Sequence, residues 1–263
     1  MPPSELPSMT SASQLSTYAT CPRRYAYRYV ERRAPERRAL GLALGSAVHS
    51  ALQWWFEMRR EGGVADLEGV LEIVRADLAA ALSVGGFAWR AETTESLVAE
   101  AERLVRSFLA THAELPVLET EVPFELDLVD PETGEILPRR LIGYLDFELQ
   151  TGNFIELKTA KRAYSETDLR VGLQFAAYRT LARYHGVDVE VLALVRTKVP
   201  RVQHVVLPHD AQVSRWFMGA AVRIERAILA GHFPPAPGMA CSSCDYRQAC
   251  LGASVAEPHA QAA

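Results

Sequence analysis

Hydrophobic positions along the chain change period near residue 116, and this change divides the predicted elements into two groups. In the first part apolar residues recur every three or four positions, as on one face of a helix. Helices are predicted at 11–18, from Cys21-Pro22 onward, and at 44–60, 65–82 and 92–113. In the second part apolar and polar residues alternate, as in half-buried strands. This pattern predicts strands at 117–128, 141–149, 154–159, 189–197 and 201–207, with helices at 166–184 and 209–230.

The order of these elements is a helical region followed by β-β-β-α-β-β-α. It predicts a single α/β domain with a helical insertion before its sheet. The domain is expected to cover 11–250, with the insertion at about 60–115 and the core at about 116–230. Residues 1–10 are interpreted as a flexible leader and residues 251–263 as a flexible tail.

The composition is ordinary for a soluble globular protein. Hydrophobic residues make up 49% of the 263 residues and charged residues 23%. No apolar run is long enough to span a membrane, and the N-terminus has no basic region followed by an apolar stretch, as a secretory signal would. We therefore expect a cytoplasmic protein that has no membrane partner.

Positive charge is concentrated in one segment, although the formal net charge of the whole chain is −4. Two glutamates and seven arginines lie between Cys21 and Leu40, and the arginines are Arg23, Arg24, Arg28, Arg32, Arg33, Arg37 and Arg38. A local basic face in an acidic protein can follow the phosphates of a nucleic acid. A solvated helix face is the alternative interpretation of the same run.

The chain contains four cysteines, one near its start and three near its end: Cys21, Cys241, Cys244 and Cys250. Their even number would allow two disulfides. A reducing compartment argues against disulfides, because it keeps thiols free. The spacing C-x2-C-x5-C of the last three favours metal ligation instead.

The stretch GYLDFELQTGNFIELKTAK, residues 143–161, carries the main candidate chemistry. Alternation places Glu156 and Lys158 on one face of a strand, and Asp146 lies on the strand before it. Two carboxylates that converge there repel each other unless a cation lies between them, and oxygen ligands suit Mg²⁺ or Mn²⁺. An E-x-K pair alone is weak, since charges on a sheet surface can serve solubility only.

Four motifs in order resemble the PD-(D/E)XK nuclease superfamily, and more narrowly its RecB-like exonuclease branch. Gly143-Tyr144-Leu145-Asp146 matches G-x-x-D, and Glu156-Leu157-Lys158 matches (D/E)-x-K. His49 in GSAVHSAL matches an upstream histidine, and Gln174 with Tyr178 matches Q-x-x-x-Y. The resemblance covers about 11–250 and is weakest at 60–115. It implies a restriction-endonuclease-like core, in which helices flank a central mixed β-sheet.

The resemblance also implies roles for these residues. His49, Asp146, Glu156 and the backbone carbonyl of Leu157 would hold one or two Mg²⁺ or Mn²⁺ ions. Lys158 would activate the attacking water or stabilise the developing charge. Gln174 and Tyr178 would position the substrate strand. Further candidates are a first-strand acid and three phosphate-contacting arginines: Glu121, Arg23, Arg24 and Arg28. For His49, Gln174 and Tyr178 ordinary packing is the alternative, and for Glu121 it is a solvated face.

Some RecB-like exonucleases hold an iron–sulfur cluster with one N-terminal and three C-terminal cysteines. They include the CRISPR-associated exonuclease that processes spacers and the AddB nuclease domain. Cys21 together with Cys241, Cys244 and Cys250 matches this pattern. The match implies a 4Fe-4S cluster that joins the two ends of the chain. Four thiolates would equally suit a structural Zn²⁺ site, and the residues alone do not separate the two.

These features together predict a metal-dependent deoxyribonuclease, in particular an exonuclease that acts on single-stranded DNA or DNA ends. DNA repair, recombination and CRISPR- or phage-related DNA processing are the contexts that the resemblance implies. Two alternatives stay open. One is a non-catalytic DNA-binding subunit with an inactive copy of the fold. The other is a subunit of a recombination or CRISPR adaptation complex whose activity needs a protein partner.

Overall fold

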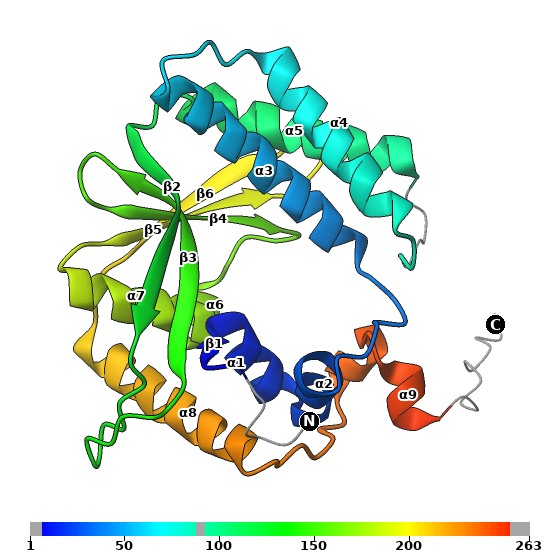
Figure 1. Ribbon diagram of the computed structural model, residues 1–263. Helices are drawn as coiled ribbons and strands as arrows, with labels where there is room; N and C mark the ends of the chain where they lie inside the picture. The colour runs from blue at the N-terminus through cyan, green and yellow to red at the C-terminus, as the bar shows by residue number, and fades with distance from the viewer. Residues whose placement is uncertain (1–6, 88–92, 253–263) are drawn as a thin grey trace.

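A computed structural model describes residues 7–87 and 93–252. Within these residues a mixed sheet has the strand order β1-β3-β4-β5-β6, with β2 paired to β3 beside this path (Figure 1). The strands are β1 (Met9–Ser11), β2 (Val117–Leu126), β3 (Arg140–Leu149), β4 (Phe154–Ala160), β5 (Val189–Val195) and β6 (Arg201–Leu207). The pairs β1–β3 and β4–β5 are parallel, and the other pairs are antiparallel.

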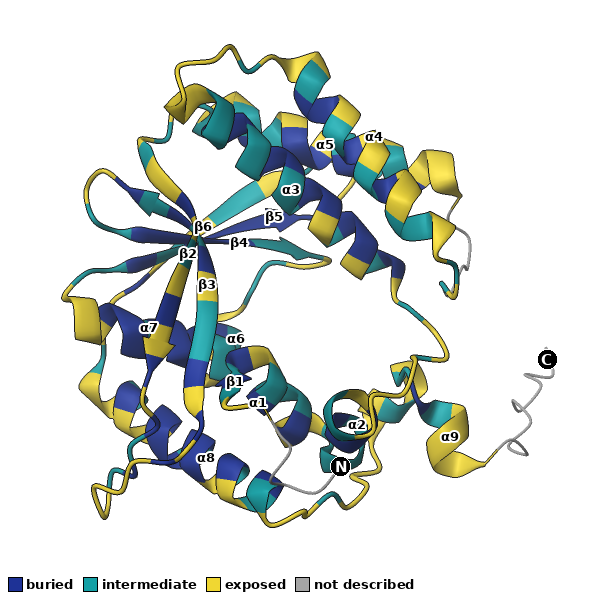
Figure 2. Cartoon of the chain, in the orientation of Figure 1, coloured by how far each residue is buried: buried dark blue, intermediate teal, exposed yellow. Residues whose placement is uncertain are grey.

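Helices cover both faces of the sheet (Figure 1). One face packs against α3 (Leu40–Arg60), α4 (Leu67–Ser83) and α5 (Thr94–His112). The other face packs against α1 (Ala12–Thr20), α7 (Leu173–His185) and α8 (Ala211–Leu229). The inner surfaces of these helices are buried, whereas their outer surfaces are exposed (Figure 2). This arrangement confirms the predicted α/β class and the mixed sheet flanked by helices.

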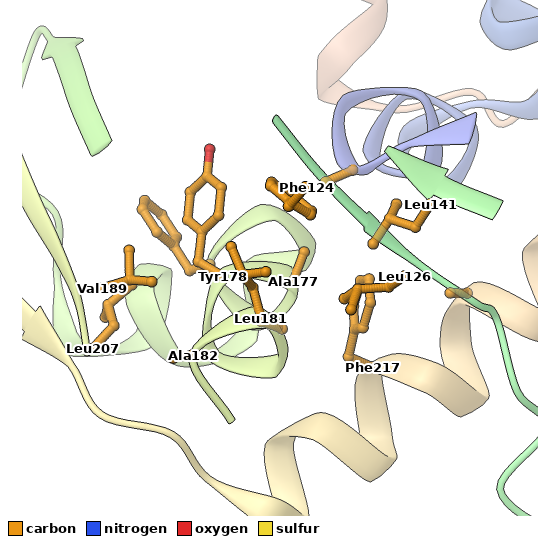
Figure 3. Close-up of a cluster of buried hydrophobic side chains, with 14 of the residues drawn as sticks. Phe124, Leu126, Leu141, Ala177, Tyr178, Leu181, Ala182, Val189, Leu207 and Phe217 are labelled. Atoms are coloured by element: carbon orange, nitrogen blue, oxygen red, sulfur yellow. The ribbon is translucent and has the colours of Figure 1, made fainter. Parts of the chain in front are cut away.

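Each face of the sheet has its own hydrophobic core. Ile155 and Leu157 of β4 pack with α3, α4 and α5, whereas Phe154 of the same strand packs with α7. This alternation follows from the two-residue period of a strand. Figure 3 shows part of the core on the face covered by α7. Tyr178 and Leu181 lie there among apolar side chains, and the Tyr178 hydroxyl is directed away from them. The tyrosine therefore belongs to the core and also presents a polar group at its edge.

The first strand differs from the prediction of a flexible leader in its last two residues. Met9 and Thr10 belong to β1, which pairs in parallel with β3. The buried Arg139 guanidinium fixes this strand, because it donates to the carbonyls of Pro7 and Met9 at 2.9 and 2.6 Å. It also pairs with the buried Glu225 of α8 at 2.8 Å. Residues 1–6 and 253–263, which include most of the predicted tail, lie outside the described residues.

Most predicted helices agree with the structure to within a few residues, but two differ in extent. The helix predicted at 44–60 begins at Leu40, and the helix predicted at 166–184 is two helices. Gly172 separates α6 (Glu166–Val171) from α7, because its extended backbone interrupts the helix. Ser11 caps α1, since its side chain accepts from the backbone N–H of Gln14. None of the helices in the described ranges is long and apolar enough to cross a membrane.

The two ends of the described chain pack against each other. The N-terminal side consists of α2 (Pro22–Tyr25) and the π-helical turn η2 (Ala26–Val30), and the C-terminal side of the 3-10 turn η3 (Met239–Ser243) and α9 (Arg247–Leu251). The rings of Tyr27 and Tyr246 lie 5.6 Å apart, and Arg24 pairs with Asp245 at 2.7 Å. The Glu36 carboxylate accepts from two backbone N–H groups of α9. These contacts place the four cysteines at one end of the molecule.

Candidate active site

Asp146 lies where β3 and β4 separate. The two strands pair only through Phe147 with Ile155 and Glu148 with Phe154. Beyond this point the backbone N–H of Leu157 donates to Oδ2 of Asp146 at 2.6 Å. The carboxylate therefore accepts a hydrogen bond from β4 where the β3–β4 ladder has ended. Because a backbone N–H on β4 holds this oxygen, the side chain is fixed against the strand that carries Glu156 and Lys158.

His49 of α3 contacts the other oxygen of the same carboxylate. Its Nδ1 lies 2.9 Å from Oδ1 of Asp146, so the structure brings the upstream histidine next to this strand. Burial lowers the pKa of His49, but the hydrogen bond and the charge of Asp146 outweigh burial and raise it overall. Small residues permit this approach of the helix. A Cβ at Gly45, one turn before His49, would lie 2.9 Å from the Thr159 hydroxyl of β4.

Glu156 and Lys158 form a buried ion pair on β4. The Glu156 residue is only 4% exposed, and its Oε2 has no hydrogen-bond partner among the described residues. Burial raises the pKa of this carboxyl group, and the nearby Asp146 carboxylate raises it further, against the opposing effect of Lys158. Burial lowers the pKa of Lys158, but Glu156 outweighs it and raises this pKa overall. Two carboxylates and one ammonium therefore share a largely dehydrated site.

Gln174 and Tyr178 lie side by side on α7, as their spacing of four predicts. The Gln174 amide donates to the Tyr178 hydroxyl at 2.7 Å. The Tyr178 ring also lies 5.8 Å from Nζ of Lys158, within the range of a cation–π contact. Burial raises the pKa of Tyr178 well above its ordinary value, so the hydroxyl keeps its proton. The Q-x-x-x-Y motif is thus coupled directly to the E-x-K motif.

The glycine of the G-x-x-D motif has a packing role. Gly143 pairs across the sheet with Phe124 of β2, and a Cβ at position 143 would lie 2.2 Å from the Phe124 ring. The ring therefore occupies the space that a side chain would need. Glu121 of the same strand has a positive φ of 52°, which is unusual for a residue other than glycine. Partial desolvation and the nearby Asp146 carboxylate raise the pKa of Glu121, so it lies close to the site although it is exposed.

The chemistry of these residues fits a divalent cation. Mg²⁺ and Mn²⁺ accept carboxylate and imidazole donors. The site offers two carboxylates, one of them with a buried unpartnered oxygen, and the His49 imidazole. In the described ranges, however, no three His, Cys, Asp or Glu side chains are arranged as a metal site. Instead the acids are paired, Asp146 with His49 and Glu156 with Lys158. Small side-chain rotations would have to release these contacts for ion binding.

The cysteines are free thiols on two contacting segments. Burial raises the pKa of Cys244, and the neighbouring Asp245 and Cys21 raise it too, which places Cys21 near Cys244. Sulfur donors, and the contact between the segment of Cys21 and the segment of the other three cysteines, fit a metal group that is held by four cysteines. The thiols themselves are not in a ligating arrangement, since none of the described cysteines belongs to a metal-holding cluster.

The three arginines predicted to contact DNA are partly engaged by the protein. Arg23 pairs with Glu31 at 3.5 Å and lies over the Tyr27 ring, and Arg24 pairs with Asp245. Arg28 lies 5.3 Å from the centre of the Tyr29 ring. Their role in DNA binding stays a prediction, but the structure gives Arg24 in particular a role in joining the two ends of the chain.

Comparison with known proteins identifies the family. The model of the PD-(D/E)XK nuclease superfamily matches residues 9–251. The chain belongs to this superfamily. The fold is similar to the crystal structure of a "putative exonuclease" from Eubacterium rectale, with 12% sequence identity, a TM-score of 0.59, and coverage of 91% of this chain and 88% of that chain. A structure described as SSO0001 covers 94% of this chain and 88% of its own, at 13% identity and a TM-score of 0.45. No curated protein matched the sequence.

One residue near the nuclease motifs was not found from the sequence. Tyr164, in the loop after β4, is close enough to Lys158 and Glu156 for their charges to affect its pKa, which burial raises overall. The side-chain amide of Gln203 fixes this loop, because it accepts from the Tyr164 N–H at 2.8 Å and donates to the Tyr164 carbonyl at 3.0 Å. The sequence carries no signal for this contact, because Gln203 lies on a distant strand.

The role of His49 in the nuclease site can be tested by substitution. We expect His49→Ala to weaken Mn²⁺ binding by about tenfold or more, because an imidazole ligand and its hold on Asp146 are lost together. Calorimetric titration of the wild type and the variant with Mn²⁺ measures this change. His204→Ala is the matched control, since His204 lies on β6 and pairs with Glu190 outside the site. Equal Mn²⁺ affinities of wild type and His49→Ala would exclude a ligand role and leave only packing.

Proposed function

We propose that this nuclease is a metal-dependent deoxyribonuclease of the RecB-like branch that degrades single-stranded DNA or DNA ends as an exonuclease. The observation that carries the proposal is the buried Glu156 carboxylate, which has one unpartnered oxygen and lies beside both Asp146 and Lys158. Burying such charge is costly, and groups of this kind gather at functional sites. The Q-x-x-x-Y contact with Lys158 and the fold likeness to a "putative exonuclease" support the exonuclease assignment.

A bound Mg²⁺ or Mn²⁺ would supply positive charge to the scissile phosphate and lower the pKa of a water. Asp146, Glu156, His49 and the carbonyl of Leu157 would hold it. The Leu157 N–H keeps Asp146 against β4, and this contact fixes the spacing of the two acids. Lys158 would then orient the attacking water or stabilise charge on the phosphate, while Gln174 and Tyr178 position the strand.

We also propose a four-cysteine cluster, most simply 4Fe-4S, that joins the two ends of the chain. Free thiols on two contacting segments support it. Structural Zn²⁺ is the alternative for the same four ligands. Thiols that stay reduced suit a cytoplasmic protein. A DNA-processing role in repair, recombination or CRISPR adaptation would fit such an enzyme, with or without a protein partner.

End-labelled DNA distinguishes these activities. Protein purified without oxygen is incubated with single- and double-stranded substrates that carry a label at either end, with Mg²⁺ or Mn²⁺. An exonuclease releases labelled mononucleotides or short products from one end first, whereas an endonuclease gives internal fragments. Circular single strands are the control, because an enzyme that needs an end leaves them intact. Binding without cleavage under all conditions would instead favour a non-catalytic or partner-dependent subunit.

A further inference from the structure

A cavity of about 1040 Å³ is lined by none of the proposed catalytic residues. Its wall is made by parts of the chain that are distant in sequence: the segment before α3, Gly86 and Phe87 after α4, the ends of two strands and the cysteine-bearing segment. In Figure 1 the beginning of α3 and α9 lie on the same side of the molecule, beyond one end of the sheet.

Five basic side chains line this cavity: Arg37, Arg38, Lys161, Arg196 and Arg247. Arg196 is neutralised, because it makes two hydrogen bonds of 2.9 Å to the Glu100 carboxylate. The other four form no ion pair with any residue in 7–87 or 93–252. Many other arginines of the protein are paired with acids, among them Arg23, Arg24 and Arg139. Two acids, Glu36 and Asp245, also line the cavity, and Asp245 pairs with Arg24. The cavity therefore keeps an excess of positive charge.

Backbone contacts hold the segments that carry these cations next to one another. The N–H of Arg38 donates to the carbonyl of Gly86 at 2.7 Å, and the N–H of Glu36 donates to the carbonyl of Asp245 at 2.8 Å. The N–H of Arg196 donates to the carbonyl of Ala160 at 2.8 Å, which places Arg196 and Lys161 at the carboxyl ends of two parallel strands. Ligands of α/β sheets commonly bind outside such strand ends.

The helix α3 and the strand β4 both connect the cavity to the proposed catalytic residues, over similar distances. On α3, Gly41 lines the cavity and His49 lies eight residues further, about 12 Å along a helix. On β4, Lys158 precedes Lys161 by three residues, about 10 Å along an extended chain. In a stacked strand this distance corresponds to about three nucleotides. One continuous DNA strand could thus have one phosphate at Lys158 and later ones in the cavity.

We infer that this cavity binds the backbone of single-stranded DNA a few nucleotides from the scissile phosphate, through Arg37, Arg38, Lys161 and Arg247. The inference rests on the proposed function and adds the path of the substrate. The volume is at the upper limit of small-ligand pockets, so it holds a few nucleotides of one strand rather than a duplex. Phe87 is the aromatic residue of its lining, and binding through phosphates is independent of base sequence.

The test replaces three cations that come from three separate segments. The variant Arg37→Gln/Lys161→Gln/Arg247→Gln is compared with Arg183→Gln/Arg201→Gln/Arg223→Gln, which removes equal charge from exposed sites outside the cavity. Binding of a fluorescein-labelled single strand of about 16 nucleotides is measured by anisotropy in EDTA, which prevents cleavage. We expect the cavity variant to bind about tenfold or more weakly, with a slope of log affinity against log salt lowered by about 2. Affinity and slope equal to those of the control variant would overturn the inference.

A minimal phosphodiester separates this inference from the proposed function. The p-nitrophenyl ester of thymidine 5′-monophosphate reaches the metal site but not the cavity, so the cavity variant should still hydrolyse it at the wild-type rate. Loss of this reaction in a folded variant would mean that the cations act in the chemistry, against the inference. If the wild type cleaves neither substrate, the proposed function fails, but the anisotropy result still decides whether the cavity binds DNA. If the triple variant melts at a lower temperature than the wild type, Lys161→Gln alone is used, because Lys161 is exposed. This single change is expected to lower the slope of log affinity against log salt by about 0.7.

Discussion

Lys158→Ala is expected to lower DNA cleavage by at least about 100-fold, the scale of losing one charged group that stabilises a transition state. The ammonium is the only basic side chain that pairs with Glu156 in the described residues, and its loss removes both that pairing and the contact with the Tyr178 ring. The variant should still fold. Its backbone keeps the pairing with Ala193 of β5, and Glu156 can take up a proton, since its pKa is already raised.

The measurement is the rate of release of end label from single-stranded DNA, together with a thermal melt of each protein. Lys198→Ala is the matched control, because Lys198 lies in the loop between β5 and β6, away from the motifs. Asp146→Asn and Glu156→Gln should show losses of similar size, because each removes a carboxylate that is proposed to hold the metal ion. Cleavage by Lys158→Ala at the wild-type rate would contradict the assignment of the active site.

The motifs of the active site could be predicted from the sequence because each lies within one element. The E-x-K spacing follows from the strand period, and Gln174 and Tyr178 share a helix face because they are four residues apart. Their meeting in space was inferred from the resemblance to a nuclease family. The structure adds the contacts that join the elements, such as the bond from the Leu157 N–H to Asp146.

Other features could not be predicted because they depend on residues far apart in the chain. The strand β1 is too short to show an alternating pattern, and it is held by Arg139, which pairs with Glu225. The positive φ of Glu121 and the Gln203 contacts to Tyr164 have no local sequence signal either. The break at Gly172 could have been suspected, since glycine weakens helices, but hydrophobic spacing continues across it.

The proposed cluster would lie where the two ends of the described chain pack against each other. The contacts that hold η3 and α9 against α2 and η2 include the Arg24–Asp245 pair and the hydrogen bond from the Tyr27 hydroxyl to the carbonyl of Ala249. These contacts are mostly polar, and Tyr246 is the one buried side chain that the cysteine segment contributes within the described residues. A metal group would close the very long loop between Cys21 and Cys241 and would hold this segment firmly.

We therefore expect protein purified without oxygen to be brown and to contain about four irons per chain, as four-cysteine ligation of a 4Fe-4S cluster requires. Cys21→Ala should lose the iron and about 3 kcal/mol of stability, which for a chain of this size lowers the Tm by about 6–12 °C. Mn²⁺ affinity at the active site should survive well below that Tm, because α3, β3 and β4 are held by a separate core. Thr20→Ala, a change at the preceding exposed residue, should keep the iron. Elemental analysis decides between the metals: one zinc and no iron would replace the cluster with a structural zinc site. Protein without metal and with two disulfides would contradict both the cluster and a reducing cytoplasmic location.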